Sequence, residues 1–256
     1  MKAKKHFGQH FLTNPDTAKH IVDAMGDLQK LNVLEVGPGM GIITQFMVHT
    51  CKAFKAVEID QEAQDYLERK FEAIDLVKAD FLTVDLRALF TTPFALIGNF
   101  PYNISSQIVF KIIENHSLVT HWVGMFQLEM GKRLLATPKD KKEYGILSAI
   151  LPFYYTLEKV MTLAPAAFNP PPKVHSIVLK AKRVEHTFNC SEVLLKKVIK
   201  TAFGKRRKTL ANSLSGLAPK EILNNHRFAT LRPENLSSLD FEELTAYIEE
   251  ECQVIL

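Results

Sequence analysis

The chain is poor in the residues that would hold a structural metal or place it in a membrane. Its 256 residues include only three cysteines, Cys51, Cys190 and Cys252, which stand far apart with no CxxC pair and no Cys/His cluster. The sequence therefore predicts a reducing compartment and no metal. No apolar run reaches the roughly 20 residues that span a bilayer, and the N-terminus lacks the apolar core of a secretory signal. We expect a cytoplasmic protein with no membrane partner.

Net charge is also small. The 32 Lys and Arg residues against 28 Asp and Glu residues leave +4, a total that does not by itself predict a nucleic-acid partner, although the sequence pI of about 8.8 leaves one open. Hydrophobic residues make up 46% and charged residues 23%, as in ordinary globular domains, which excludes a wholly disordered or fibrous chain. The length favours one large domain with a small appendage.

Strand and helix patterns alternate along the first part of the chain. A helix is predicted from Asn14 to Gly26, and helical patterning with charged faces recurs at Gln61–Phe71 and Ser105–Glu114. Such alternation predicts a mostly parallel sheet that is covered on both faces. The strands are expected at residues 31–36, 53–59, 74–79, 94–97 and 122–126.

The later part of the chain departs from this alternation. Runs at Leu157–Leu163 and Val174–Lys182 read as two strands without a long helix between them, which predicts an antiparallel hairpin at the sheet edge. From Ser191 onward only helical spacing remains. We therefore predict an α/β domain over residues 1–184 and a small all-α domain over residues 185–256.

The small net charge conceals a polarity within the predicted helical domain. Residues 185–233 carry ten basic residues against three Glu, whereas residues 234–256 carry seven acidic residues and no basic one. The acidic helix near Asp240–Glu251 is expected to face solvent or to pair with the basic part.

A glycine-rich turn follows the first predicted strand of the sheet. Gly37, Gly39 and Gly41 are spaced as GxGxG, one residue short of the dinucleotide pattern GxGxxG, so the turn alone is weak support for a ligand site. Glu58 stands 21 residues after Gly37, where doubly wound folds place an acid that binds ribose hydroxyls, and Asp80 ends the next strand. Each acid could instead cap a helix. Together they favour nucleotide binding.

The fourth strand ends in Asn99-Phe100-Pro101-Tyr102, and this motif resembles the signature of S-adenosylmethionine-dependent methyltransferases that act on exocyclic amino groups. Three further segments, at residues 8–12 (GQHFL), 144–148 (YGILS) and 168–176 (FNPPPKVHS), resemble the bacterial ribosomal RNA small-subunit adenine dimethyltransferases. The resemblance runs over essentially the whole chain. It implies a Rossmann-like class I methyltransferase sheet and S-adenosylmethionine as the cofactor.

The motif has a chemical logic of its own. The N6 lone pair of adenine is delocalised into the ring, and acceptors for both N6 hydrogens would favour the rehybridised nitrogen that can attack a methyl group. The Asn99 side-chain oxygen and the Pro101 carbonyl are the expected acceptors, and Pro101 stiffens the turn that holds them. Tyr102 is expected to stack on the base and Phe168 to close its other face.

The resemblance also implies a set of cofactor contacts. His10 stands where Asn is often found and Phe100 replaces the commoner Leu, but neither change removes an expected acceptor, since His10 can contribute through its backbone. Glu35 is expected behind the loop or at the methionine end. The cofactor residues implied are His10, Leu12, Glu35, Gly37, Gly39, Glu58, Asp80 and Asn99.

A basic run from Lys196 to Lys208 contains seven Lys or Arg in thirteen residues. Such a run could be a solvated helix face, but its density favours contact with phosphate. The resemblance supports this, since the family has a basic helical domain that grips ribosomal RNA. The residues 139–142 segment is a weaker extension. The expected RNA-binding residues are Arg133, Lys205, Arg206, Arg207 and Lys208.

The resemblance implies a specific substrate. It is a pair of adjacent adenosines in a hairpin loop near the 3′ end of 16S rRNA in the 30S particle, each receiving two methyl groups from a monomeric enzyme that takes part in small-subunit biogenesis. Two alternatives remain open at this point. One is a resistance-type methyltransferase of 23S rRNA, and the other is an assembly factor that binds RNA without catalysis.

Overall fold

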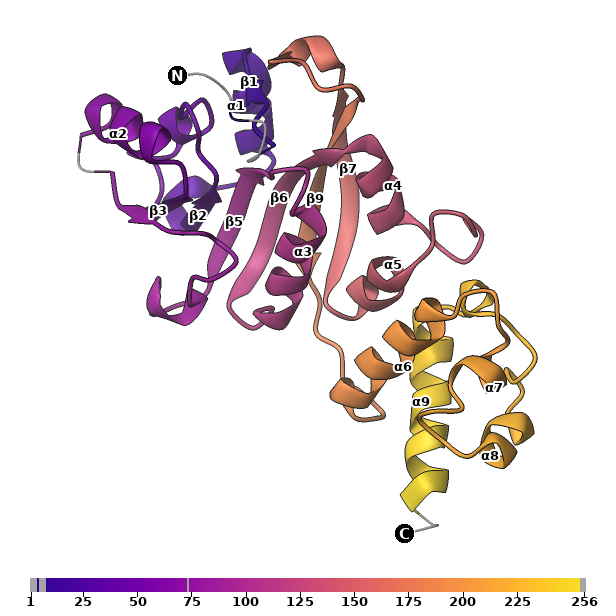
Figure 1. Cartoon of the computed structure of the whole chain (residues 1–256). Coiled ribbons are helices and arrows are strands. Elements are labelled where there is room, and N and C mark those ends of the chain that lie inside the picture. The colour runs from indigo at the N-terminus through magenta and orange to yellow at the C-terminus, as the bar shows by residue number, and fades with distance from the viewer. Residues whose placement is uncertain (1–3, 5–7, 73, 254–256) are drawn as a thin grey trace. The chain divides into compact units, whose positions relative to one another are not determined.

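The computed structural model describes residue 4, residues 8–72 and residues 74–253. The chain folds into two compact units (Figure 1). The sheet unit comprises residues 1–131 and 155–183, and the helical unit comprises residues 132–154 and 184–256. The division between residues 183 and 184 lies one residue from the domain boundary that the sequence predicts. Residues 132–154, which the sequence places with the sheet, belong to the helical unit instead.

The sheet unit is built on a seven-stranded sheet of order β4-β3-β2-β5-β6-β9-β7. β2 pairs in parallel with β3 and β5, β3 with β4, and β5 with β6, while β9 pairs antiparallel with both β6 and β7. The predicted α/β sheet with an antiparallel edge is thereby confirmed. The strands are β2 (Asn32–Val36), β3 (Ala53–Glu58), β4 (Leu76–Lys78), β5 (Phe94–Asn99), β6 (Val119–Gln127), β7 (Tyr155–Leu163) and β9 (Ser176–Arg183).

The central strands are apolar on both faces because both faces are covered. On β5, Ala95 and Ile97 belong to a core cluster that includes the inner residues of α1 (Pro15–Asp23), whereas Leu96 is buried on the opposite side. Figure 1 shows α3 (Ser105–Glu114) in front of the sheet beside β5 and β6. Helix α2 (Gln61–Lys70) also belongs to this unit; it begins at an Asp60 cap and contacts β3 and β4.

Two local features differ from the pattern of the sequence. The glycine turn leads into turns and a short 3-10 helix at Thr44–Phe46 rather than into an α-helix. A second sheet of two short strands, β1 (Phe11–Leu12) and β8 (Phe168–Asn169), joins the N-terminal segment to the proline-rich loop. Strands of two residues carry no periodic signal, so only their pairing across the fold reveals them.

The helical unit gathers α5 (Ile146–Ile150), α6 (Glu192–Gly204), α7 (Leu210–Ser213), α8 (Lys220–Asn225) and α9 (Ser238–Gln253). Helix α4 (Leu128–Leu135) crosses the division between the two units. Residues 132–154 pack here because Tyr154 donates a 2.8 Å hydrogen bond to Glu192 and the Tyr144 ring meets Phe203 edge-on at 5.8 Å. Interactions of this kind join segments far apart in sequence and leave no local pattern.

The acidic C-terminal helix does not simply face solvent. The carboxylate of Glu242 is buried and accepts hydrogen bonds from His186 at 3.0 Å and from the Asn189 N–H at 2.9 Å. Glu249 accepts from the Ser191 N–H at 2.8 Å. These two carboxylates therefore fix the segment that enters α6. In the part of the chain that the structure describes, no helix is both long and apolar enough to cross a membrane.

Candidate active site

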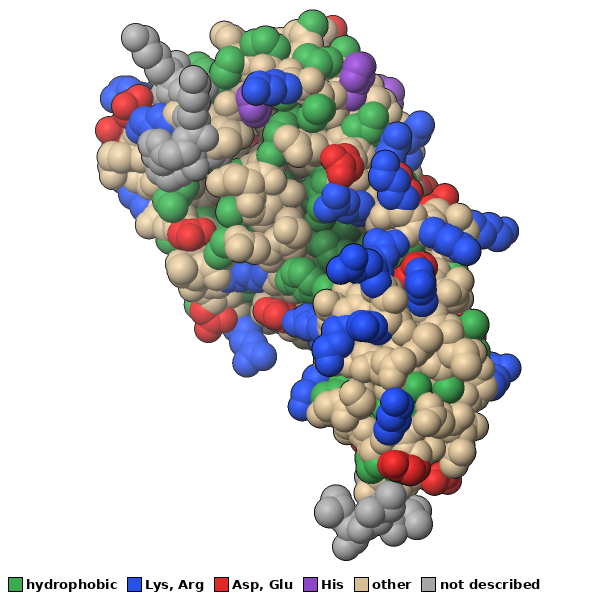
Figure 2. Space-filling model, turned by 45° about the vertical axis from the view of Figure 1, so that its right-hand side comes forward, with side chains coloured by type: hydrophobic (Ala, Val, Ile, Leu, Met, Phe, Trp, Pro, Cys, Tyr) green, Lys and Arg blue, Asp and Glu red, His purple; other side chains and the backbone are tan. Residues whose placement is uncertain are grey.

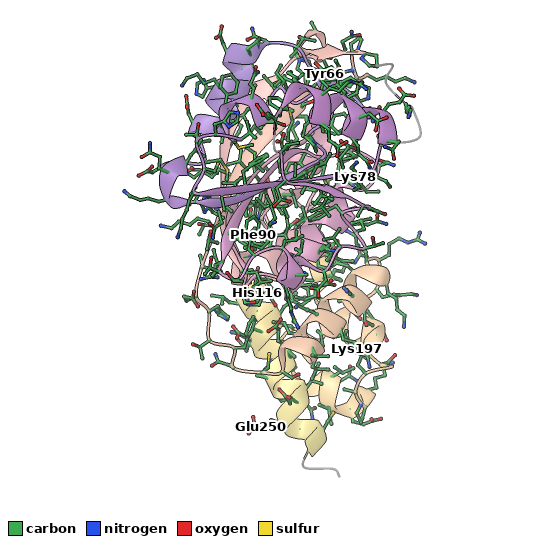
Figure 3. The ribbon with its side chains drawn as sticks, turned by 90° about the vertical axis from the view of Figure 1, so that its left-hand side faces the viewer. Tyr66, Lys78, Phe90, His116, Lys197 and Glu250 are labelled. Atoms are coloured by element: carbon green, nitrogen blue, oxygen red, sulfur yellow. The ribbon has the colours of Figure 1, made fainter. Side chains whose placement is uncertain are left out.

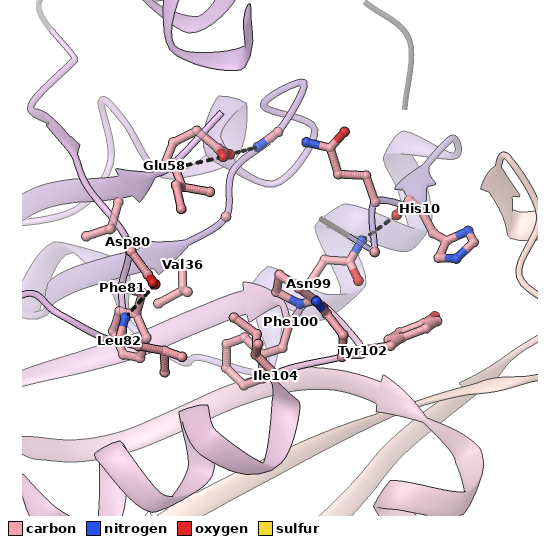
Figure 4. Close-up of a pocket in the computed structure, with 18 of the residues that line it drawn as sticks. His10, Val36, Glu58, Asp80, Phe81, Leu82, Asn99, Phe100, Tyr102 and Ile104 are labelled. Atoms are coloured by element: carbon pink, nitrogen blue, oxygen red, sulfur yellow. Dashed lines mark hydrogen bonds between the residues drawn. The ribbon is translucent and has the colours of Figure 1, made fainter. Parts of the chain in front are cut away.

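A pocket opens at the carboxyl ends of β2, β3 and β5, where ligands of open parallel sheets bind. Figure 4 shows Glu58 and Asp80 at one end, His10 and Tyr102 at the other, and Asn99 between them. The N-terminal segment at residues 8–11 forms part of the wall. Among the residues predicted from the sequence, those that line the pocket are His10, Gly37, Gly39, Glu58, Asp80, Asn99, Pro101 and Tyr102.

The glycine turn is shaped to hold the Glu58 carboxylate. Gly37 and Gly39 have φ angles of 68° and 55°, which strongly favour glycine. The Gly39 N–H donates to Glu58 at 3.0 Å, and the N–H groups of Ile59 and Asp60 donate to its other oxygen at 2.9 Å. Burial raises the pKa of Glu58 above its ordinary value, and the three N–H donors oppose that rise. The carboxylate is fixed and retains lone pairs for hydroxyl donors in the pocket.

Asp80 forms a local turn and also lines the pocket. One of its carboxylate oxygens accepts from the Leu82 N–H at 2.9 Å, which is the local turn-forming contact of an Asp. The side chain also lines the pocket beside Phe81 and Leu82 (Figure 4). Its second oxygen is left to accept from a ligand.

Asn99 is oriented by the N-terminal segment. Its side-chain Nδ2 donates to the His10 carbonyl at 2.7 Å, drawn as a dashed line in Figure 4. Because the amide nitrogen is committed to that contact, Oδ1 is the atom offered to a ligand. His10 thus acts through its backbone, while its ring stacks on Tyr102 with centroids 5.3 Å apart.

The other three residues of the motif, Phe100, Pro101 and Tyr102, are held by packing and hydrogen bonds. Phe100 is fully buried, and its ring occupies the space above Gly124, where an added Cβ would lie 2.4 Å from the ring. The Pro101 carbonyl accepts from the Ile104 N–H at 3.2 Å and keeps a second lone pair. The Tyr102 hydroxyl shares a 2.6 Å hydrogen bond with Ser176 of β9. Gly124 and Ser176, which lie outside the motif in the sequence, therefore help to hold Phe100 and Tyr102 in place.

Three of the residues predicted for catalysis or cofactor binding, Leu12, Glu35 and Phe168, do not line this pocket. Leu12 and Phe168 are both in the buried core cluster, because β1 and β8 pair and turn these side chains toward α1. Phe168 is only 3% exposed, so its position does not support the stacking role expected for it. Glu35 is buried behind the glycine turn, where Thr44 donates to it at 2.7 Å, and burial raises its pKa to about 8. It lies behind the ligand space rather than in it.

Sequence reasoning missed the apolar wall at the carboxylate end and the lysine beneath it. Ile59 lines the pocket although it is 46% exposed, and Phe81 and Leu82 complete that wall. Lys111 of α3 donates to the carbonyls of Leu82 at 2.9 Å and Val84 at 2.5 Å. An apolar residue directly after each strand-end acid was the available signal for the wall; nothing local indicated Lys111.

The N-terminal segment is tied down at the same end of the pocket. Asp60 accepts from the Lys4 ammonium at 2.6 Å and from the Gln9 side-chain amide at 2.9 Å. These partners lower the pKa of Asp60, against the opposing effect of burial. Asp60 therefore links the cap of α2 to the segment that carries His10.

The predicted RNA-binding residues all fall in the helical unit. Lys205, Arg207 and Lys208 are exposed after α6, as is Arg133 on α4. Arg206 differs, because its guanidinium donates to the carbonyls of Lys141 and Lys142 and pairs with Glu234 at 3.6 Å. Arg206 therefore joins the segment at residues 139–142 to the basic turn at residues 205–208. Figure 2 shows Lys and Arg side chains gathered on one face of this unit, and Figure 3 labels Lys197 on α6 and Glu250 on α9.

Comparison with known proteins decides the family. A family model described as "Ribosomal RNA adenine dimethylase" matches residues 1–252. The chain belongs to this family. A protein named Ribosomal RNA small subunit methyltransferase A from Phocaeicola vulgatus is 44% identical over 97% of this chain and 90% of its own length. Its counterpart from Bacteroides thetaiotaomicron is 42% identical over 98% of this chain and 95% of its own.

Solved structures share the fold. A dimethyladenosine transferase from Plasmodium falciparum superposes with a TM-score of 0.79 over 92% of this chain and 96% of its own, at 24% identity. The 23S rRNA methyltransferase ErmE gives a TM-score of 0.67 over 92% of this chain and 99% of its own, also at 24% identity. The Rossmann-like methyltransferase fold is thereby established.

Enzymes of this family take their methyl groups from S-adenosylmethionine, and the pocket residues fit that donor. A fixed carboxylate at Glu58 suits ribose hydroxyls, and the apolar wall with Asp80 suits an adenine ring that has donors on its edge. Gly37 and Gly39 allow the backbone to approach a ligand closely. Asn99, between this end and Tyr102, stands where the two substrates would meet.

Proposed function

We propose that this protein transfers methyl groups from S-adenosylmethionine to N6 of two adjacent adenosines in a hairpin loop near the 3′ end of 16S rRNA, dimethylating each within the small ribosomal subunit. The observation that carries this proposal is the Asn99 amide, whose nitrogen is held by the His10 carbonyl at 2.7 Å. The names of the relatives support the choice of the small subunit. We place the protein in the cytoplasm, acting as a monomer.

The chemistry requires little acid–base work from the protein. The bound donor supplies a methyl group on a sulfonium, which leaves as a neutral thioether. In the first transfer Asn99 Oδ1 and the free lone pair of the Pro101 carbonyl accept from the two N6 hydrogens, which draws the nitrogen lone pair out of the ring and stabilises the positive charge that develops there. In the second transfer one N6 hydrogen remains for these acceptors, and after each transfer the methylated nitrogen loses a proton to water. Tyr102 supplies a surface against which the target base is positioned.

Positioning of the methyl donor and the target base accounts for the rest of the rate enhancement. Glu58 and Asp80 lie on one side of Asn99 and Tyr102 lies on the other, which supports a donor end and a base end on opposite sides of this amide. Holding two reactants in line converts a bimolecular step into an effectively unimolecular one. The basic turn at residues 205–208 contributes affinity for the phosphate backbone rather than chemistry.

The test is methyl transfer from labelled S-adenosylmethionine to undermethylated 30S particles, with 50S particles lacking methyl groups as the matched comparison. We expect N6,N6-dimethyladenosine at two adjacent positions of 16S rRNA and no incorporation into 23S rRNA. Methylated adenosine in 23S rRNA alone would contradict the proposed substrate and show that the enzyme acts on the large subunit. Folded protein that binds particles without incorporation would show a binding factor instead.

A further inference from the structure

A second cavity of about 630 Å³ lies next to the active-site pocket in the sheet unit. The two cavities share the residues 8–10 segment of their walls. The far wall comes from the loop between β8 and β9, at residues 170–174, and from Gln127 at the end of β6. None of these far-wall residues has a role in the mechanism described above.

His10 is the partition between the two cavities. Its ring stacks on Tyr102 at an interplanar angle of 26°, and its Nδ1 donates to the Pro170 carbonyl at 2.7 Å. The same residue holds Asn99 through its carbonyl. The second cavity therefore begins one side chain away from the surface expected to receive the target base.

The far wall offers polar groups that the protein does not use. Across the described residues, neither the Gln127 amide nor the Lys173 ammonium makes a hydrogen bond or an ion pair. Gln127 is half-buried, and its register partner on β9 is Ser176, which contacts Tyr102. Lys173 is exposed on the loop. An amide can pair with the edge of a base, and a lysine can meet a phosphate.

We propose that this second cavity binds the nucleotide next to the adenosine being methylated. The inference rests on the proposed function, because a base that is drawn out of its stack leaves its neighbour at the rim of the pocket, where flanking contacts set substrate choice. The neighbouring base packs against the His10 ring and the proline wall, the Gln127 amide pairs with its edge, and Lys173 meets the adjoining phosphate. The same sites then recognise a pair of nucleotides rather than one.

The experiment couples changes in the protein to changes in the RNA. A synthetic 3′ segment with an abasic nucleotide on one or the other side of the target adenosine is ligated into 16S rRNA before reconstitution of small subunits. Single-turnover methyl transfer is then measured for wild type, Gln127→Ala and Lys173→Gln. The matched controls are Gln29→Ala and Lys159→Gln, exposed residues of the sheet unit outside both cavities.

Wild type should lose about tenfold in rate on one of the two abasic particles, the loss expected for one stacked base. Gln127→Ala should lose a similar factor on the intact particle and little more on that abasic particle. Lys173→Gln should lower the rate of methyl transfer by the same factor on the intact and the abasic particles, and the two control variants should transfer methyl groups at the wild-type rate. Equal sensitivity of wild type and Gln127→Ala to the abasic change on both sides would overturn the inference while leaving the proposed function intact. Absence of transfer to intact particles by wild type would instead remove the proposed function, and the inference with it.

Discussion

The two units use their polar residues in different ways. In the sheet unit the functional groups are held in place by hydrogen bonds, as when Asn99 donates to the carbonyl of the distant His10 and the N–H groups of Gly39, Ile59 and Asp60 fix Glu58. In the helical unit the basic groups at Lys205, Arg207 and Lys208 project into solvent. Fixed groups suit chemistry, where an ångström matters, whereas exposed charges suit a long-range grip on phosphates. Activity and affinity should therefore be separable by mutation.

Asn99→Ala should have the largest effect. It removes the acceptor for an N6 hydrogen, and loss of one such preorganised group costs about 10²–10³-fold in rate. Methyl transfer to 30S particles should fall by that factor while particle binding stays within about twofold. The matched control is Asn224→Ala at an exposed position of α8. A parallel loss of binding in Asn99→Ala would break the comparison between the units.

Removal of the exposed charges should do the reverse. Replacing Lys205, Arg207 and Lys208 together with Gln should weaken particle binding by about 10–100-fold and reduce the slope of log affinity against log salt by up to about three. Turnover at saturating particle concentration should be retained. Titrations at several salt concentrations measure both effects. An unchanged salt slope would show that this turn does not contact phosphate.

Arg206→Gln sharpens that comparison, because this arginine is engaged within the helical unit. Its loss frees the carbonyls of Lys141 and Lys142 and leaves Glu234 without its ion-pair partner. We expect a decrease of about 1 kcal/mol in the free energy of unfolding, measured by urea denaturation. A stability equal to that of wild type, with weakened binding, would place Arg206 among the RNA contacts instead.

Lys111→Met should weaken the donor end of the pocket without touching the base end. It removes both hydrogen bonds to the loop that carries Phe81 and Leu82 and the contact of the ammonium with the Phe81 ring at 5.3 Å. We expect about a tenfold rise in KM for S-adenosylmethionine with kcat unchanged, since bonds to charged groups contribute ~1.5–3 kcal/mol. Calorimetry and steady-state rates test this. Lys78→Met, which loses only an exposed pair with Glu68, is the control.

The last comparison concerns two glycines, one in each unit. Gly124→Ala places a methyl group against the Phe100 ring and should lower the free energy of unfolding by about 1–3 kcal/mol, with slower methyl transfer. Gly204→Ala meets nothing within 4 Å at the end of α6 and should raise stability by up to ~1 kcal/mol. Thermal and urea denaturation measure both. Equal stability of the two variants would contradict the packing described for Phe100.

Much of the pocket lining was predictable because it lies at strand ends. The glycine turn, Glu58, Asp80 and Asn99 each stand at or just after the end of a strand, and parallel strands bring their carboxyl ends to one edge. The roles of Leu12 and Phe168 were not predictable in this way. Their side chains are turned into the core by the β1–β8 pairing, whose strands of two residues have no pattern of their own. The role of Lys111 was not predictable either, because its hydrogen-bond partners lie on a loop about 30 residues earlier in the chain.

The sequence by itself determined the class of fold, the family and the order of the motifs along the chain, because hydrophobic period and short motifs are local properties. Only the tertiary structure decided which groups support one another. It placed residues 132–154 with the helices, joined Arg206 to the carbonyls of Lys141 and Lys142, assigned Glu242 to the segment entering α6, and set a second cavity beside His10. These outcomes depend on side chains that meet across large sequence separations, where packing and hydrogen bonding, rather than local preference, select the conformation.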